Sequence, residues 1–231
     1  MDDVTREMGY SYYALLHHVD LSHFRSDLTH MKRGEMVALS SYPESWIEIY
    51  LRDQIVNRDP VLLASHRTNA GFYWHEMPNL IRITKAPREV REATLRAGIE
   101  DGFTVPAHVP GEANGSCNFA MARGLDVPRG QRALAQAIGA FAFSAARTMV
   151  ENASGLRREP RRALTPRVLD CIVLSARGTS YWEIGKILAL STATVKRHME
   201  IAREHYDVTT KEQVIAHALF EGQIALSDLI K

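Results

Sequence analysis

Three aromatic residues and a carboxylate in the first half of the chain have the chemistry of a small-molecule site. Tyr42, Trp46 and Tyr50 recur at four-residue steps, which places them on one face of a predicted helix. Asp59 and Trp74 follow further along the chain. Tyrosine and tryptophan combine donors with apolar rings, and aspartate adds an acceptor. The alternative is an aromatic stripe in the hydrophobic core, with Asp59 as a turn or cap residue.

A second group of residues, near the C-terminus, has the chemistry of a DNA contact. The group lies in one predicted helix over residues 192–206 and combines hydroxyl with cationic side chains. Its members are Thr192, Thr194, Lys196, Arg197 and Arg203. A helix of this kind fits the major groove, where the side chains of its first turns reach base edges and phosphates. The alternative is a small helical bundle that contacts other proteins.

Cap residues predict the helices that position this second group. Thr165 precedes Pro166, a favoured pair at a helix start, and that helix is expected to end at Arg177. Ser180 and Glu183 have the spacing of a capping box at the start of a second helix. One face of this helix is expected to carry Ile184, Ile187 and Leu188.

The third helix completes a predicted helix-turn-helix. Ser191 is in position to cap it, and Val195 and Met199 are expected to pack it against the other two helices. A specific set of residues runs through all three helices: Leu164, Thr165, Arg167, Ala176, Gly178, Glu183, Ile184, Ser191, Thr194, Val195, Lys196 and His198. This set closely resembles the DNA-binding domain of LuxR-type regulators. Val168, Gly185, His205 and Tyr206 depart from the family pattern, at positions that concern helix packing more than groove contacts.

The first half of the chain carries a resemblance to the same family. The residues that match, in order, are Tyr42, Trp46, Tyr50, Asp59, Pro60, Trp74, Gly102 and Pro106. They are similar to the autoinducer-binding domain of quorum-sensing LuxR-type proteins, which respond to N-acyl-homoserine lactones. The resemblance spans roughly residues 9–151. It implies an α/β/α sandwich with an antiparallel sheet and a ligand enclosed between the sheet and one helical layer.

The resemblance gives the polar residues of this set separate roles. Trp46 donates its indole N–H to the lactone carbonyl, Tyr42 donates to the acyl carbonyl, and Asp59 accepts the amide N–H of the ligand. The chemistry agrees with these roles, because the ligand has one donor and two carbonyl acceptors and a dry pocket must satisfy all three. No metal or cofactor is expected beyond this signal ligand.

Four further residues complete the expected ligand site. The resemblance places Trp74 against the lactone ring and Tyr50 against the acyl chain. Val61 follows Asp59 by two residues and is included in the ligand-binding set. Asn118 aligns near the position where the family has Ser or Thr assisting the acyl carbonyl.

The chain is predicted to divide into a first domain over residues 1–153, a linker over 154–162 and a second domain over 163–231. The linker region contains Ser, Gly, Pro and four arginines, Arg157, Arg158, Arg161 and Arg162, which either contact phosphates or are solvated. The first 154 residues carry 16 basic and 18 acidic side chains, a balance of −2, and the last 77 carry 12 and 9, a balance of +3. This asymmetry favours a polyanionic partner for the second domain.

Hydrophobic patterning predicts an α+β fold for the first domain and an all-α fold for the second. Helices are expected over 43–57 and 87–97, and strands over 36–40, 71–74, 103–108 and 118–123. An amphipathic helix over 128–151, with Leu134, Ile138, Phe141 and Ala145 on one face, closes the domain and offers a surface to a second copy of the chain. Compared with the family, most of the usual N-terminal helix is expected to be absent or shortened.

Several classes of protein are excluded by what the sequence lacks. Apolar stretches such as 133–150 are interrupted before they reach the roughly 20 apolar residues of a membrane span, and the first residues do not form a signal peptide. Cys117 and Cys171 lack the spacing of a disulfide framework or zinc site. The early histidines, His17, His18, His23 and His30, lack a metal-binding pattern, and no nucleophile elbow is present.

The sequence therefore predicts a cytoplasmic transcription regulator rather than an enzyme. Its expected partners are an autoinducer, double-stranded DNA with an inverted-repeat operator, a second copy of the chain and RNA polymerase. One alternative keeps the DNA-binding half and changes the sensor, so that the protein answers a different small molecule or represses when unliganded. An enzyme acting on lactones is the more distant alternative.

Overall fold

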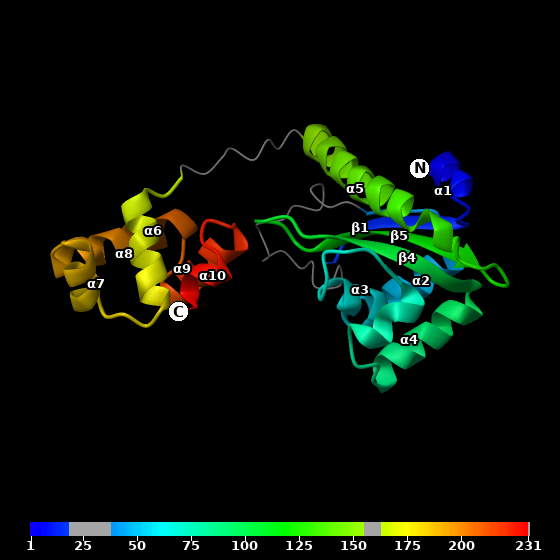
Figure 1. Ribbon diagram of the computed structural model, residues 1–231, viewed down its shortest axis with the longest axis horizontal. Coiled ribbons are helices and arrows are strands. Elements are labelled where there is room, and N and C mark those ends of the chain that lie inside the picture. Colours follow the sequence, from blue (N-terminus) through cyan, green and yellow to red (C-terminus); the bar gives the residue numbers. More distant parts are fainter. Residues whose placement is uncertain (19–37, 155–162, 231) are drawn as a thin grey trace. The chain divides into compact units, whose positions relative to one another are not determined.

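Figure 1 shows the computed structural model, which describes residues 1–18, 38–154 and 163–230. The chain forms two compact units, the first with the elements from α1 to α5 and the second with those from α6 to α10. The four linker arginines, His23 and His30 lie outside the described residues, as do the first two positions of the strand predicted over 36–40.

A five-stranded antiparallel sheet forms the centre of the first unit, in the order β2-β1-β5-β4-β3. Residues of the central strand β5 alternate between two buried faces, as the pleat of a strand requires. Cys117 and Phe119 belong to one hydrophobic core and Ala120 to another. The strands are β1 (Tyr12–His17), β2 (Ala38–Ser40), β3 (Phe72–Tyr73), β4 (Ile99–Ala107) and β5 (Gly115–Ala122).

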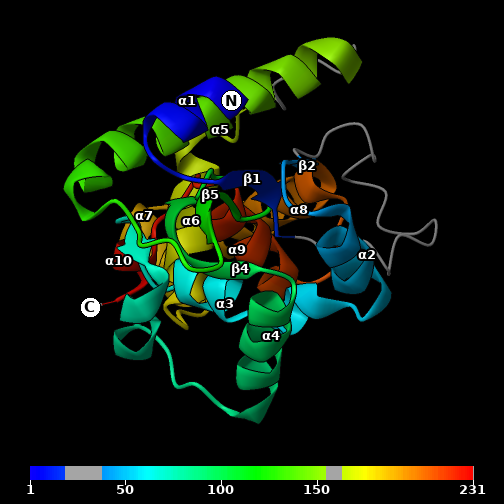
Figure 2. The same ribbon diagram turned by 90° about the vertical axis from the view of Figure 1, so that its right-hand side faces the viewer.

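Helices cover both faces of the sheet (Figure 2). The helices α1 (Asp2–Glu7) and α5 (Arg132–Ser154) lie over one face, and α2 (Glu44–Arg52), α3 (Pro60–Ser65) and α4 (Lys85–Arg96) lie over the other. Short 3-10 helices occur at η3 (Ile55–Arg58), η4 (Trp74–Asn79) and η5 (Arg129–Gln131). The predicted α/β/α sandwich with an antiparallel sheet is confirmed.

The helix predicted over 43–57 is wrong at its C-terminal end. It stops at Arg52, and Gln54 adopts a left-handed conformation with φ of 50° and ψ of 47°. An α-helix does not continue through such a residue, so the chain turns and resumes as η3. The guanidinium of Arg58 donates to the carbonyl oxygen of Asp53 at 3.0 Å and closes the turn.

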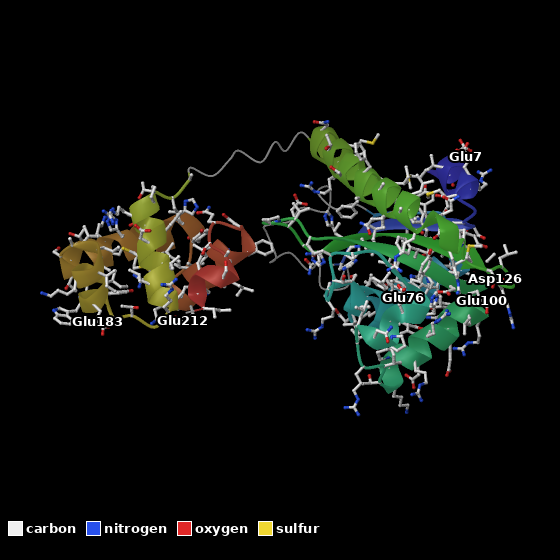
Figure 3. All side chains as sticks on the ribbon, in the orientation of Figure 1. Glu7, Glu76, Glu100, Asp126, Glu183 and Glu212 are labelled. Carbon is white, nitrogen blue, oxygen red and sulfur yellow. The ribbon has the colours of Figure 1, made fainter. Side chains whose placement is uncertain are left out.

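The strand predicted over 71–74 is shorter than expected, because Trp74 already begins η4. The carboxylate of Glu76, labelled in Figure 3, accepts from the backbone N–H of Tyr73 at 2.9 Å and fixes this transition. It also pairs with the guanidinium of Arg132 at 2.9 Å. The same carboxylate therefore ties η4 to the start of α5.

The long helix α5 exposes part of the stripe that the sequence predicted as its apolar face. Phe141 is 81% exposed and Leu134 is 46% exposed, whereas Ala135, Phe143 and Ala146 on the opposite side are buried against the sheet. Both sides of the helix are apolar, so periodicity alone does not say which side meets the sheet.

By length and composition, residues 129–150 also qualify as a membrane span, with a mean hydropathy of 1.3. This differs from the expectation that no apolar stretch is long enough. Gly139 lets the helix approach β4 closely, because a Cβ at this position would lie 2.7 Å from a side-chain carbon of Val105. One face of α5 therefore packs on the sheet.

The second unit contains α6 (Pro166–Ala176), α7 (Tyr181–Leu188), α8 (Thr192–Tyr206), α9 (Lys211–Phe220) and α10 (Leu226–Leu229). Val195 and Met199 are fully buried, as predicted, and pack α8 on α6 and α9 together with Ile172 and Val214. On the apolar face expected for α7, Ile184 is fully buried, whereas Ile187 is 60% exposed.

Two of the three predicted caps of this unit make side-chain hydrogen bonds. The capping box forms between Ser180 and Glu183, which Figure 3 labels, and the hydroxyl of Ser191 accepts from the backbone N–H of Thr194 at 3.0 Å. Thr165 occupies the N-cap position of α6 without a side-chain hydrogen bond. Gly185 allows the tight turn between α7 and α8, because a Cβ there would lie 2.7 Å from the carbonyl oxygen of Leu190.

Candidate functional site

A cavity of about 450 Å³ lies in the first unit, between the sheet and the layer of α2, α3 and α4. Strands β1 and β2 form one wall, and α2, the start of α3 and α4 form the other. The structure brings together all of the residues that were expected to bind a ligand, and each of them lines this cavity: Tyr42, Trp46, Tyr50, Asp59, Val61, Trp74 and Asn118.

The carboxylate of Asp59 is held at both oxygens. Asp59 is the N-cap of α3, where Oδ1 accepts from the backbone N–H of Val61 at 2.9 Å, and Oδ2 accepts from the hydroxyl of Tyr50 at 2.9 Å. Burial raises the pKa of Asp59 above its ordinary value, and these hydrogen bonds oppose that shift. Asp59 is therefore both a helix cap and a cavity residue, and the hydroxyl of Tyr50 orients its carboxylate by donating a hydrogen bond to it.

Trp46 and Tyr42 contribute donors that have no hydrogen-bond partner within the described residues. Trp46 is 4% exposed and contacts the ring of Tyr50 edge to face, with centroids 5.8 Å apart. The ring of Tyr42 meets that of Tyr12 edge to face at 6.1 Å. Burial, and next the Asp59 carboxylate, raise the pKa of Tyr42, so its hydroxyl keeps its proton. Two donors and one carboxylate thus border the same cavity.

Trp74 presents its ring to the cavity, because its indole N–H is already used. That N–H donates to the hydroxyl of Thr104 at 2.9 Å. Gly102 makes room for the ring, since a Cβ at this position would lie 2.7 Å from Cε2 of Trp74 and 2.4 Å from the carbonyl oxygen of Phe119. A glycine is therefore needed in β4 opposite this tryptophan.

Asn118 is 4% exposed and uses its amide inside the sheet. Its Oδ1 accepts from the hydroxyl of Thr104 at 2.8 Å. Its Nδ2 donates to the hydroxyl of Ser116 at 3.0 Å and to the carbonyl oxygen of Ala14 at 3.3 Å. Both N–H donors of the Asn118 amide are therefore already used inside the sheet, whereas the hydroxyl of a serine or threonine could still donate.

The sequence reasoning missed two polar cavity residues on α4, Arg91 and Thr94. The guanidinium of Arg91 donates through Nη2 to the carbonyl oxygen of Glu100, while Nη1 has no partner within the described residues. Burial lowers the pKa of Arg91, and the neighbouring carboxylates of Asp101 and Glu100 counter this effect. The helical period would have found both residues, because they share a face with the buried Val90.

The five residues expected to contact DNA all lie on α8, but their surroundings differ. Lys196 and Arg197 are exposed, and Arg197 pairs with Glu200 at 3.4 Å and with Glu204 at 3.2 Å. Thr192 and Thr194 are half-buried in the first turn. Exposed ion pairs of this kind are weak, so Arg197 remains available to a phosphate or base.

Arg203, near the end of α8, is half-buried and reaches the hydroxyl of Tyr181 on α7 at 3.4 Å. It therefore makes a contact inside the helical unit. The exposed cations of the group are concentrated in the first half of the helix, which is the part of a recognition helix that reads bases.

Comparison with known families agrees with this division into a cavity and a helix-turn-helix. Residues 1–149 match the model of the autoinducer binding domain, and residues 162–218 match that of the bacterial regulatory proteins of the luxR family. The chain belongs to the LuxR family. A LuxR-type regulator of this kind combines a ligand-binding domain with a DNA-binding domain, so the predicted family, fold class and function are confirmed.

Individual relatives cover most of this LuxR-type chain. It is 27% identical over 195 residues to the quorum sensing-dependent transcriptional regulator RpaR of Rhodopseudomonas palustris, with 83% of this chain and 76% of that protein covered. It is 24% identical over 234 residues to the transcriptional activator LuxR of Aliivibrio fischeri, with 97% and 86% covered. The crystal structure of SdiA of Escherichia coli has the same fold, with a TM-score of 0.60, 19% identity and coverage of 100% of this chain and 89% of that chain.

Proposed function

We propose that this regulator binds an N-acyl-homoserine lactone in the cavity and, as a homodimer, controls transcription at an inverted-repeat operator. The observation that carries the proposal is the set of polar groups at the cavity wall. Trp46 and Tyr42 offer two unused donors, and Asp59 offers a carboxylate acceptor. An acyl-homoserine lactone has two carbonyl acceptors and one amide donor, so the two sets are complementary.

Each polar group then has one partner on the ligand. The indole N–H of Trp46 donates to the lactone carbonyl, the hydroxyl of Tyr42 donates to the acyl carbonyl, and Asp59 accepts the amide N–H. A carboxylate in an apolar cavity is costly to desolvate, and the amide N–H offsets part of that cost. Because only the folded domain binds the ligand, occupancy also stabilises the fold.

The apolar parts of the ligand have matching surfaces. The ring of Trp74 packs on the lactone, and Val61 and the ring of Tyr50 contact the acyl chain. The cavity volume of about 450 Å³ lies within the range of roughly 300–1,000 Å³ that is typical of small-molecule sites. Tyr50 has a second role that the resemblance did not supply, because its hydroxyl orients Asp59.

For the DNA-binding domain we propose that α8 enters the major groove. Lys196 and Arg197 reach bases or phosphates, Thr192 and Thr194 contact the backbone at the first turn, and Arg203 supports the helix from its far end. A dimer of such domains reads two half-sites about one helical turn apart, so the operator is an inverted repeat about 20 base pairs long. The regulator acts in the cytoplasm and contacts RNA polymerase at the promoter.

The outward face of α5 is the proposed contact between two copies of the chain. Phe141 is 81% exposed, Met149 is 71% exposed and Leu134 is 46% exposed. A symmetric dimer places the same patch of both copies in contact, which removes these side chains from water. The dimer would therefore be held chiefly through the first domain.

Mass spectrometry of ligands extracted from the purified protein tests the proposal. The full chain is produced in cells supplied with a panel of acyl-homoserine lactones, and its organic extract is compared with that of the Trp46→Phe variant produced in the same way. We expect one intact lactone in near-stoichiometric amount from the natural chain and less from the variant. A ring-opened or cleaved product would favour an enzyme, and an extract without lactone would favour a regulator of a different small molecule or one that acts unliganded.

A further inference from the structure

A continuous series of hydrogen bonds runs through the sheet from the cavity wall to a pair of histidines. The indole N–H of Trp74 donates to Thr104 at 2.9 Å, Thr104 donates to Oδ1 of Asn118 at 2.8 Å, and Nδ2 of Asn118 donates to Ser116 at 3.0 Å. Ser116 in turn contacts Nε2 of His18 at 2.8 Å, and Nδ1 of His18 contacts Nε2 of His66 at 3.0 Å. Trp74 and Asn118 are the members of the series that line the cavity.

The direction of this series is fixed by groups that can act in only one way. An indole N–H only donates, so Thr104 accepts from Trp74 and its own proton is directed to Oδ1 of Asn118. A backbone carbonyl only accepts, so the atom of Asn118 that faces Ala14 at 3.3 Å must be the NH2 group. The two contacts agree and set the orientation of the Asn118 amide without ambiguity.

The amide of Asn118 therefore has one unused capacity. Its two N–H donors are taken by Ser116 and the carbonyl of Ala14, and Oδ1 has accepted one of the two hydrogen bonds that it can accept. Within the described residues no further group donates to Oδ1. Toward the cavity, Asn118 can accept a hydrogen bond but cannot donate one, whereas a serine or threonine at this position can do both.

We propose that Asn118 is a specificity-determining residue that selects a lactone whose acyl chain carries a hydroxyl group close to the acyl carbonyl. The inference rests on the proposed function, in which the only donor of an unsubstituted lactone, its amide N–H, is used by Asp59. A donor for Asn118 must then come from the acyl chain. A hydroxyl on the third acyl carbon supplies one, while a keto oxygen at the same carbon would face the lone pair of Oδ1 without a proton between them.

Dose–response midpoints for matched lactones test the proposal in the full-length protein with an operator-driven reporter. Acyl chains of four, eight and twelve carbons are each supplied as the unsubstituted, 3-hydroxy and 3-oxo forms. At the preferred length we expect the 3-hydroxy form to act at a midpoint about 2- to 12-fold lower than the unsubstituted form, the effect of one neutral hydrogen bond. The 3-oxo form should act at a higher midpoint than the unsubstituted form.

The variant Asn118→Ser separates this role of Asn118 from a general effect on folding. A serine hydroxyl at this cavity position can donate to a ligand acceptor as well as accept, whereas the amide of Asn118 can only accept there. The ratio between the 3-oxo and 3-hydroxy midpoints should therefore fall toward one. Ser11→Ala is the control, because Ser11 accepts from Ala122 in the same sheet and is not part of the series. Loosening of the sheet would raise all midpoints together and leave the ratio unchanged.

The outcomes distinguish this inference from the proposed function. If lactones act on the protein but the 3-oxo form is as potent as the 3-hydroxy form, or more so, the role of Asn118 is wrong and the lactone site stands. An unchanged ratio in Asn118→Ser would also overturn it. If no lactone of any length or substitution acts, the proposed function fails and the inference fails with it.

Discussion

The hydroxyl of Tyr50 donates to Oδ2 of Asp59 at 2.9 Å, across the left-handed turn at Gln54 that follows α2. The N-cap hydrogen bond from the backbone N–H of Val61 holds the other oxygen, so the carboxylate is oriented before any ligand arrives. In the proposed complex, the ligand amide would therefore meet an acceptor that needs no reordering, and preorganisation of this kind improves affinity.

Replacing Asp59 tests whether this carboxylate binds the amide. Asp59→Asn keeps the shape and removes the charge, which weakens a charge-assisted hydrogen bond of roughly 1.5–3 kcal/mol. We expect the lactone dose–response midpoint to rise by about 10- to 150-fold. Tyr50→Phe, which keeps the ring and removes only the orienting hydroxyl, should produce a smaller rise.

The control for this series is Asp53→Asn. Asp53 is an exposed carboxylate in the same turn, pairs with Arg52 at 2.8 Å and is not part of the cavity wall. Its midpoint should equal that of the natural chain. If Asp59→Asn also responds at the natural midpoint, Asp59 is only a helix cap.

Much of this site could be predicted because its signals are local or come in a characteristic order. Of the three aromatic residues predicted on one helical face, Trp46 and Tyr50 lie in α2, whereas Tyr42 precedes the helix, although all three line the cavity. The caps at Ser180 and Ser191 form as expected. Local hydrogen bonds of this kind follow from the residue types themselves.

The remainder depends on contacts between distant segments. A glutamine at position 54 does not predict a left-handed conformation, so the end of α2 could not be placed from the sequence. The hydrogen bond between Tyr50 and Asp59, which spans this turn, could not be predicted either. The partner of the Trp74 indole depends on the pairing of β3 with β4, which places Phe72 opposite Thr104. Phe141 was predicted on an apolar face, but only the packed structure shows that this face is outside.

Alanine substitutions on α8 test the proposed groove contact. Lys196→Ala and Arg197→Ala should each weaken operator binding by roughly 1–3 kcal/mol where a good base contact is lost, without a change in folding. Fluorescence anisotropy with a fixed salt concentration measures the affinity. Arg88→Ala, an exposed arginine of α4, removes the same charge from the other domain and should bind as the natural chain does. Full affinity in the double variant of Lys196 and Arg197 would remove α8 from the groove.

A charged residue on the outer face of α5 tests the proposed dimer. Phe141 is 81% exposed in the single chain, and a symmetric dimer would bury it in both copies. Phe141→Glu would place a carboxylate at this buried position in each copy. Burial of one phenylalanine side chain is worth roughly 1.5–3 kcal/mol, so the dimer dissociation constant should rise about 100-fold or more. Sedimentation velocity with ligand present measures the association. Leu125→Glu, at an exposed leucine outside α5, should leave the dimer intact, and a dimeric Phe141→Glu would place the contact elsewhere.

The acid sensitivity of the first domain should depend on His18. Its ring lies between His66 and Ser116, at 3.0 and 2.8 Å. Burial, followed by the nearby His66, His108 and His17, lowers the pKa of His18 to about 3. The pKa of His66 is also lowered, mainly by burial. A proton on His18 would place a positive charge in a partly dry site, and protonation of His66 as well would place like charges on adjacent rings.

The direction of the pH effect follows from proton binding in the two states. Below the ordinary pKa of about 6.5 the unfolded chain takes up a proton at His18 that the folded chain refuses, so folding is penalised as the pH falls from 6.5 toward 3. Above pH 6.5 the contribution of His18 to stability is fully present. Between pH 7.5 and 5.5 we expect His18 alone to remove about 1 kcal/mol of unfolding free energy.

Urea titrations of the full chain at these two pH values measure the effect through the transition of the first domain. The loss of unfolding free energy should be smaller in His18→Gln by that amount, whatever the stability of the variant at pH 7.5. His75→Gln is the matched control, because His75 is exposed and contacts a carboxylate, Asp101, at 3.1 Å. Equal losses in His18→Gln and the natural chain would show that His18 takes up its proton as readily in the folded domain as in the unfolded chain.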